Sequence, residues 1–323
     1  MTQLMPEKEF FTALEAARQP KHGGGHAFSR AWAANELSRS QLGEWAIQHF
    51  YYIDPIPQQF ALLYSRLPDL DARQHLLENL LGEEMPGRPG KRHPDLLRKF
   101  ARACGVSDER ILKAEQAGEI LATTRAMRAW IWELSGIRSL PESCAGIMVA
   151  LEGQLPTLYP KYVEAMRRMG FGEDDLEFFH VHIVGDTEHA HVGLELTARY
   201  ATTPELQQRA IAAVRASAEM RFSMLDGIHA SVDQGSGSVG GGHVAGHHLD
   251  IGMILFDLAD SLDDASGVAV CGIDDDAVRA GFDQCGSAFA EIARGADGRC
   301  HSQAAEFVFS RSRVFDRFLN VFD

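Results

Sequence analysis

Apolar residues recur at intervals of three and four positions through the first 230 residues, the pattern of helices with one buried face. No segment in this span alternates apolar and polar residues strictly enough to predict a strand. The pattern predicts helices at 6–18, 41–67, 71–84, 94–104, 108–116, 121–135, 141–168, 174–200 and 204–229. About seven or more helices with short connections predict an all-α bundle.

Turn-forming residues mark where these helices begin, bend and end. Ser38 and Gln41 form a capping box ahead of 41–67. The PGRPG stretch at 86–90 ends one helix, and Gly170 ends another. Prolines should kink two of the long helices, at Pro55 and Pro57 and at Pro156 and Pro160.

The helical pattern stops at a Gly-, Ser- and His-rich stretch, 231–248, which predicts a linker or loop between a domain at 1–230 and a helical extension at 249–323. This stretch spells G-x-G-x-x-G, but it lacks the preceding strand and following helix of a dinucleotide site. Helices are expected in the extension at 249–263, 275–294 and 302–320. Their role stays open between packing on the bundle, covering a site and forming a homodimer contact.

Composition and charge exclude several classes of protein. The hydrophobic content of 45% and charged content of 24% are ordinary for a soluble globular protein. We expect no membrane span, because no run of 18 apolar residues occurs, and no signal peptide at the acidic N-terminus. A net charge of −14 argues against nucleic acid and anionic membranes as partners. Five scattered cysteines suggest reduced thiols, and hence a cytoplasmic protein.

The expected helix at 174–200 carries the strongest chemical signal. His182, Asp186 and His189 are spaced four and then three residues apart. At about 100° per residue they fall near 0°, roughly 40° and roughly −20°, on one narrow stripe of the helix. His180 and His191 fall on the opposite, hydrated side. The stripe therefore predicts three ligands to a metal.

Further ligands must come from other helices. Glu152 interrupts the apolar run CAGIMVALEGQL, where an ionised carboxylate needs a metal or a buried salt bridge. Glu83 and Glu84 both follow an apolar helical pattern, so periodicity does not decide which of them points inward. His93 precedes Pro94 at the start of the next helix.

The chemistry of this set favours iron. Mixed carboxylate and imidazole ligands in this number suit two iron ions better than zinc, which usually takes four ligands. Thiolates are absent from the set, so an iron–sulfur cluster is not expected. Ferritin-like centres place Glu-x-x-His on two different helices. Here that motif occurs twice on one helix and on its hydrated side, at Glu177/His180 and Glu188/His191, which argues against a ferritin-like site.

The order Glu83, His93, Glu152 and then His182-x-x-x-Asp186-x-x-His189 resembles the heme-oxygenase-like diiron oxidase and oxygenase superfamily, over about residues 5–230. The resemblance implies a seven-helix bundle without heme, followed here by the C-terminal helical extension. It implies that Glu83, rather than Glu84, is the first ligand. It also implies two Fe(II) ions that react with O2, and substrates that are amino acids, their conjugates or fatty acids.

Two features depart from relatives of this superfamily. One branch makes para-aminobenzoate from its own tyrosine with a nearby lysine. Its tyrosine position corresponds to Ser29, and Lys161 lies one place from its lysine position. We therefore do not expect that activity. Cofactor-free relatives, of the thiaminase and pyrroloquinoline-quinone synthase kind, lack the full ligand set, which favours the metal-binding branch.

The expected function is that of an O2-dependent non-heme diiron oxidase or oxygenase in natural-product biosynthesis. The substrate would be small and amino-acid-derived, and the outcome N-oxygenation, desaturation or oxidative C–C cleavage. Its carboxylate would need a cationic partner, for which Arg138, Lys161 and Arg168 are candidates, none of them assigned. A cofactor-free enzyme on the same fold and a non-catalytic metal-binding or interaction bundle remain the alternatives.

Overall fold

The computed structural model describes residues 3–234, except for the side chains of residues 186–189 and 234, and every regular element in this part is helical. The expected all-α class is confirmed. The α-helices are α1 (Glu7–Arg18), α2 (Ala27–Ala33), α3 (Arg39–Ile53), α4 (Ile56–Arg66), α5 (Leu70–Glu84), α6 (His93–Ala103), α7 (Asp108–Lys113), α8 (Ala122–Gly136), α9 (Leu140–Cys144), α10 (Leu155–Arg168), α11 (Glu177–Tyr200) and α12 (Pro204–Gln234).

Local sequence signals set several of these bounds. The capping box is present: the Ser38 side chain accepts from the backbone N–H of Gln41, whose side chain accepts from the backbone N–H of Ser38. The expected kink at Pro55 and Pro57 is a break, since α3 ends at Ile53 and α4 begins at Ile56. Gly170, after α10, has a φ of +80°, a conformation that glycine adopts without strain.

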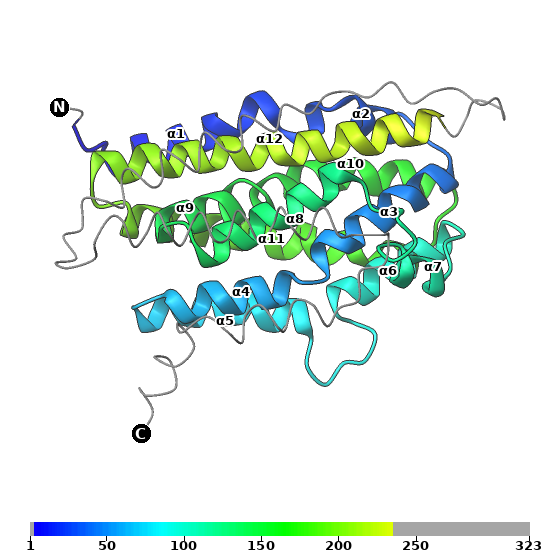
Figure 1. Cartoon of the computed structure of the whole chain (residues 1–323), viewed down its shortest axis with the longest axis horizontal. Coiled ribbons are helices and arrows are strands. Elements are labelled where there is room, and N and C mark those ends of the chain that lie inside the picture. Colours follow the sequence, from blue (N-terminus) through cyan, green and yellow to red (C-terminus); the bar gives the residue numbers. More distant parts are fainter. Residues whose placement is uncertain (1–2, 235–323) are drawn as a thin grey trace, which may run out of the picture. The chain divides into compact units, whose positions relative to one another are not determined.

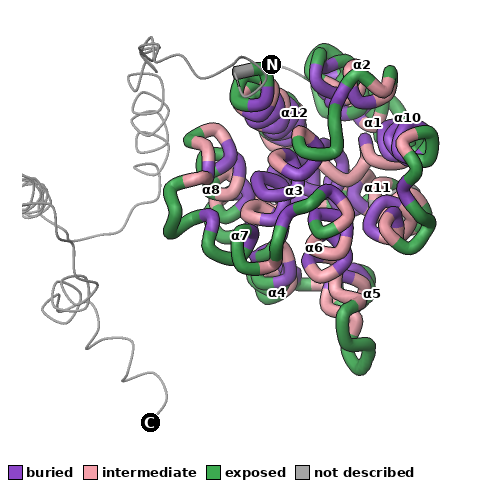
Figure 2. Tube along the Cα trace, turned by 90° about the vertical axis from the view of Figure 1, so that its right-hand side faces the viewer, coloured by how far each residue is buried: buried purple, intermediate pink, exposed green. Residues whose placement is uncertain are grey.

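Helix α11 runs through the bundle, where it packs against α9, α10 and the segment 145–154 (Figure 1). Helix α12 lies against α1, α8 and α9, and the α4–α5 pair forms one edge. Buried residues line the sides of the helices that face one another (Figure 2). Large rings fill the core between α2, α3, α6, α10 and α11: Trp32, Trp45, Phe100, Tyr162 and Phe179.

The segment expected as one kinked helix at 141–168 is divided in a different way. After α9 comes a π-helical turn, Ala145–Val149, and then a 3₁₀ turn, Glu152–Gln154, before α10 starts at Leu155. Pro160 lies inside α10, so the helix continues through it. Pro156 lies in the first turn of α10, where its missing N–H removes no helical hydrogen bond. The irregular stretch therefore precedes both prolines and contains Glu152.

The described part ends with α12 at Gln234, a few residues beyond the domain end expected at 230. The remainder of the expected linker at 231–248 and the helices at 249–263, 275–294 and 302–320 lie outside the described residues. Among the helices of residues 3–234, none combines the length and the apolar composition that crossing a bilayer requires.

Candidate metal centre

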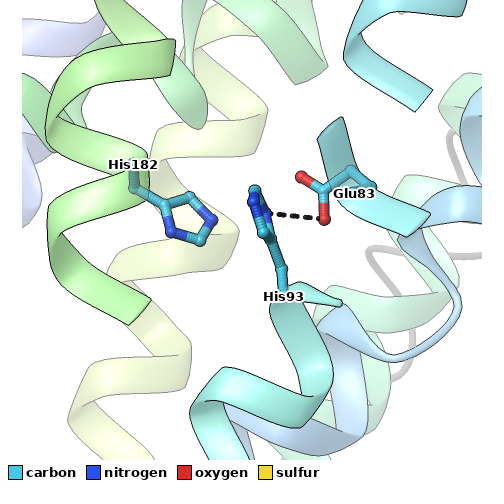
Figure 3. A group of neighbouring side chains, drawn as sticks. All are labelled: Glu83, His93 and His182. Carbon is cyan, nitrogen blue, oxygen red and sulfur yellow. Dashed lines mark ion pairs between the residues drawn. The ribbon is translucent and has the colours of Figure 1, made fainter. Parts of the chain in front are cut away.

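Three of the expected ligands converge from three helices. Glu83 comes from the last turn of α5, His93 from the first residue of α6, and His182 from α11 (Figure 3). Each offers one ligand atom, and these atoms lie within 4.8 Å of one another. A carboxylate oxygen of Glu83 lies 3.0 Å from Nδ1 of His93, and the rings of His93 and His182 are 4.4 Å apart.

The turn between α5 and α6 places Glu83 beside His93. Helix α5 ends at Met85, whose φ of 42° lies in the left-handed region, and Gly87 and Gly90 each have a φ of +75°. The Arg92 guanidinium donates to Glu84 at 2.6 Å, which ties the two ends of the turn together. Glu84 is therefore held on the outer side, whereas Glu83 is only 9% exposed and faces the histidines.

A backbone hydrogen bond fixes which nitrogen of His182 is available to a ligand. Nδ1 lies 2.6 Å from the carbonyl oxygen of Phe178, one turn earlier in α11. A carbonyl can only accept, so Nδ1 carries the proton and Nε2 carries the lone pair. This is the arrangement usual for metal-binding histidines, where one nitrogen donates to the protein and the other binds the metal.

Two lysines attach α6 and the loop before it to the start of α11. Lys91 and Lys99 both form ion pairs with Glu177, the first residue of α11. The hydrogen bond from Lys91 is the main reason that the pKa of Glu177 is lowered. These partly exposed contacts hold the elements that carry His93 and His182 against each other.

Glu152 lies on the same interior space. It begins the 3₁₀ turn after the π-helical turn, and the Asn79 amide donates to its Oε1 at 3.4 Å. Glu152, Glu83 and His182 line one cavity of about 60 Å³. The structure therefore brings a fourth expected ligand to the wall of the cavity that holds two members of the cluster.

The other two expected ligands are Asp186 and His189. Both lie on α11, but their side chains are not among those that the structure describes. The two histidines expected on the hydrated side behave as expected in the part that the structure describes. His180 pairs with Glu173 at 3.0 Å, and His191 pairs with Glu195 at 3.2 Å.

A buried polar chain lies next to His182, and sequence reasoning missed it. The Arg221 guanidinium donates to Nδ1 of His49 at 3.2 Å and to the hydroxyl of Tyr52 at 3.1 Å. Nδ1 of His49 is thus an acceptor, which leaves the proton on Nε2, 3.4 Å from the Tyr159 hydroxyl. Burial, followed by the charges of Arg221 and His182, holds the pKa of His49 well below its usual value, so His49 is neutral.

Some of these missed residues carried a usable signal in the sequence. Asn79 lies four residues before Glu83, one helical turn away, and so marks the same face of α5. His49 is a polar residue within the apolar stretch WAIQHFYYI. Two of the unassigned candidate cationic partners form ion pairs elsewhere: the half-buried Arg138 pairs with Glu133, and the exposed Arg168 pairs with Glu164.

The residues present fit an iron centre in their chemistry. Imidazole nitrogen and carboxylate oxygen are the ligands of non-heme iron. Two histidines and one carboxylate meet here, with Glu152 on the same cavity wall. Neither of the cysteines in the described part lies among these groups, and both are buried with a pKa raised to about 12 by burial.

Comparison with known proteins identifies the family. Residues 43–222, more than half of the chain, match a family described as iron-containing redox enzymes. The chain belongs to this family. The resemblance noted in the sequence is thereby confirmed, and the family supports an iron-dependent redox enzyme.

Curated relatives in this family carry two kinds of name. A 4-aminobenzoate synthase of Nitrosomonas europaea is 28% identical over 239 residues, which cover 70% of this chain and 93% of the relative. A pyrroloquinoline-quinone synthase of Acidiphilium cryptum is 28% identical over 233 residues, covering 71% and 92%. A 4-aminobenzoate synthase of Chlamydia muridarum is 31% identical, covering 56% and 74%. All of these relatives are enzymes that make small molecules.

Solved structures confirm the heme-oxygenase-like fold. A TenA homologue from Pseudomonas syringae pv. tomato superposes with a TM-score of 0.59 at 16% identity, covering 71% of this chain and 99% of that one. A domain of Shewanella denitrificans with a heme oxygenase-like fold gives a TM-score of 0.59 at 14% identity, covering 75% and 100%. At these identities the likeness concerns the fold alone.

Proposed function

We propose that this protein is an O2-dependent non-heme diiron oxidase or oxygenase. Its two iron ions would be held by Glu83, His93, Glu152, His182, Asp186 and His189. The observation that carries the proposal is the meeting of Glu83, His93 and His182 within 4.8 Å, where the distant helix α11 brings His182 to the consecutive helices α5 and α6. Membership of an iron-containing redox family supports the identity of the metal.

The residues around the site perform distinct tasks. The carboxylates of Glu83 and Glu152 would offset the charge of the metal ions, and the bond to Phe178 holds His182 in the ligating orientation. Apart from these ligand candidates, the cavity wall is aliphatic and aromatic. Bound Fe(II) would supply the electrons that reduce O2, and thereby the oxidising power for the reaction.

The substrate would be a small molecule derived from an amino acid, and the outcome N-oxygenation, desaturation or oxidative C–C cleavage in natural-product biosynthesis. The names of the relatives support small-molecule chemistry. We do not propose 4-aminobenzoate synthesis for this chain. The branch that makes para-aminobenzoate uses its own tyrosine, and the corresponding position here is Ser29. That residue is buried, and its Oγ accepts from the Tyr162 hydroxyl at 2.7 Å.

Anaerobic titration with Fe(II), followed by rapid mixing with O2, tests this proposal. We expect two ions per chain and an optical transient that depends on O2. His182→Ala should lose iron and the transient. His180→Ala, on the outer side of the same helix and paired with Glu173, is the matched control and should keep both.

An O2-dependent optical transient of full size in His182→Ala would contradict the assignment of His182 as a metal ligand. Turnover of a substrate by iron-free protein would instead support the cofactor-free alternative. Iron uptake without any O2-dependent transient would support a metal-binding bundle without catalysis.

A further inference from the structure

Helices α4 and α8 form an outer face of the bundle that carries almost no charge. Figure 2 shows both helices on the outside of the bundle. The exposed residues of α4 are Gln58, Ala61, Leu62 and Ser65. Those of α8 include a single charge and are Ala122, Arg125, Ala126, Ala129, Trp132 and Gly136. We call these two sets together the α4–α8 face. By contrast, the outer side of α12 carries Arg209, Arg215 and Glu219.

Large apolar side chains are exposed on and beside the α4–α8 face. Trp132 is 37% exposed and Leu62 36%, and Ile137, directly after α8, is 80% exposed. A methyl group built at Gly136 would lie 2.9 Å from Cδ2 of Leu62, so the two helices form one continuous surface. Trp132 precedes Gly136 by one helical turn. Adjoining exposed apolar side chains of this kind mark an interaction surface, and tryptophan is enriched in such surfaces.

Two opposite charges lie symmetrically about the middle of α8. Arg125 comes four residues before Ala129, and Glu133 comes four residues after it. They are about 12 Å apart along the helix, so they cannot pair with each other within one chain. Each has a partner in its own chain: Arg125 pairs with Glu115 at 3.0 Å, and Glu133 pairs with Arg138 at 2.7 Å. Both pairs are partly exposed, and such pairs contribute little to stability, so they can exchange for contacts with another molecule.

This arrangement is complementary to itself. In a two-fold dimer the same surface meets its own copy, so that residue i contacts residue j and residue j contacts residue i. An antiparallel copy of α8 centred on Ala129 would bring Arg125 beside Glu133 of the second copy, and it would do so twice. Trp132, three residues after Ala129, would lie over Ala126 of the second copy, three residues before it. Opposite charges and a large side chain against a small one would therefore meet at once.

We propose that the α4–α8 face is the interface of a homodimer in which the two α8 helices pack antiparallel about Ala129. The occupant is a second copy of this chain, because mirror-related charges on one helix complement that helix itself. The inference does not depend on the proposed function, since it uses none of the expected metal ligands. The same two helices supply Ile56, Phe60 and Ile131 to the wall of the cavity, so the dimer contact would brace that wall from outside.

Sedimentation equilibrium of the full-length protein, from about 1 to about 100 μM, tests whether two chains associate. We expect a two-chain species with a dissociation constant in the micromolar range or below. Trp132→Asp removes the largest exposed side chain of the face and places a charge there, and it should weaken the dimer at least about tenfold. Leu112→Asp makes the same kind of change on α7, at a residue that is 55% exposed and lies outside the face, and should leave the dimer unchanged.

Exchange of the two charges tests the antiparallel pairing. Arg125→Glu and Glu133→Arg each place like charges opposite one another, and each should weaken the dimer at least about tenfold. The double variant carries opposite charges again, and should return the dissociation constant to within about threefold of the wild-type value. Because the two residues are too far apart to meet within one helix, a contact inside a single chain cannot produce this rescue. Circular dichroism of each variant reports its helical content.

The inference is overturned if the wild-type protein is a single chain at about 100 μM, where even a micromolar interface would be formed. It is also overturned if the dimer is as tight in a folded Trp132→Asp, since another surface then joins the chains. If Trp132→Asp fails to fold, the charge variants decide, because Arg125 is exposed and Glu133 partly so. A folded double variant that remains as weak as the single variants refutes the pairing.

Discussion

Gly193 lets α11 approach the irregular segment that carries Glu152. A methyl group built at Gly193 would lie 2.5 Å from Cβ of Met148, and 3.4 Å from the Met148 carbonyl carbon and the Val149 nitrogen. These atoms belong to the π-helical turn and cannot rotate away. Gly193→Ala should therefore push α11 away from the segment 145–149.

The expected magnitude follows from two opposing effects. Alanine stabilises a helix by about 1 kcal/mol relative to glycine. Overpacking a tight contact costs about 1–3 kcal/mol, and an overlap with fixed backbone belongs at the upper end. We expect a net loss of about 1–2 kcal/mol in the free energy of unfolding for Gly193→Ala.

Gly82→Ala, in α5, provides a matched control. A methyl group there would meet nothing within 4 Å, so we expect a gain of about 0.5–1 kcal/mol. Urea unfolding of the iron-free proteins, followed by far-ultraviolet circular dichroism, gives both values from shifts in midpoint at unchanged slope. If Gly193→Ala proved as stable as the wild type, the close packing described here would be refuted.

Three further predictions concern single residues. Because the pKa of His49 is well below 6.5 in the folded protein, unfolding becomes easier as pH falls below that value. Between a pH of about 7.5 and one of about 5.5, His49 should account for a loss of about 1.4 kcal/mol in the free energy of unfolding. Urea unfolding at the two pH values measures this loss, and His49→Gln should abolish it. Ser38→Ala should cost about 1 kcal/mol through loss of the capping box, measured in the same way. Glu83→Gln should lower iron affinity by at least about tenfold in competition with a chelator, and Glu84→Gln should not, because Glu84 pairs with Arg92 outside the cluster.

Most of the helices could be predicted from the sequence because each has one buried face, but α2 (Ala27–Ala33) lies outside every predicted range. Helix α5 illustrates the limit of that approach. Glu83 and Glu84 fit its apolar pattern equally well, and the choice between them depends on Arg92, which follows an intervening turn. A residue eight positions from Glu84 thus helps to hold that carboxylate away from His93, and the periodicity of one helix does not predict such a contact.

The break before Glu152 was not predictable for a related reason. The kinks were expected at Pro156 and Pro160, yet the irregular turns lie ahead of both and contain Gly146 and Gly153. The Arg18 guanidinium, from α1, donates to the carbonyl oxygen of Val149 at this break. This tertiary contact gives a hydrogen bond to a carbonyl that would have accepted one from the backbone in a regular helix. The apolar run CAGIMVALEGQL contains no signal that predicts it.

Arg221 shows the opposite case, a residue whose identity was visible but whose environment was not. Arginine in a helix usually lies at the surface, and the stretch RASAEMRFSM does not distinguish Arg221 from the exposed Arg215. Only the packing of α12 against α3 buries it beside His49 and Tyr52.

Contacts from α1 and α11 hold the irregular segment 145–154, which carries Glu152, beside the candidate centre. A carboxylate on a continuous α-helix would be confined to one direction by the helical repeat, whereas the π-helical and 3₁₀ turns re-aim the chain at Glu152 toward the cavity. The irregular turns cost helical stability, and buried contacts offset that cost: Arg18 on Val149 from one side and Gly193 against Met148 from the other. A side chain at Gly153 would overlap the Arg18 guanidinium and would therefore shift the first contact. Residues that have no contact with the proposed irons therefore fix where Glu152 can point, and the cavity that it lines depends on them.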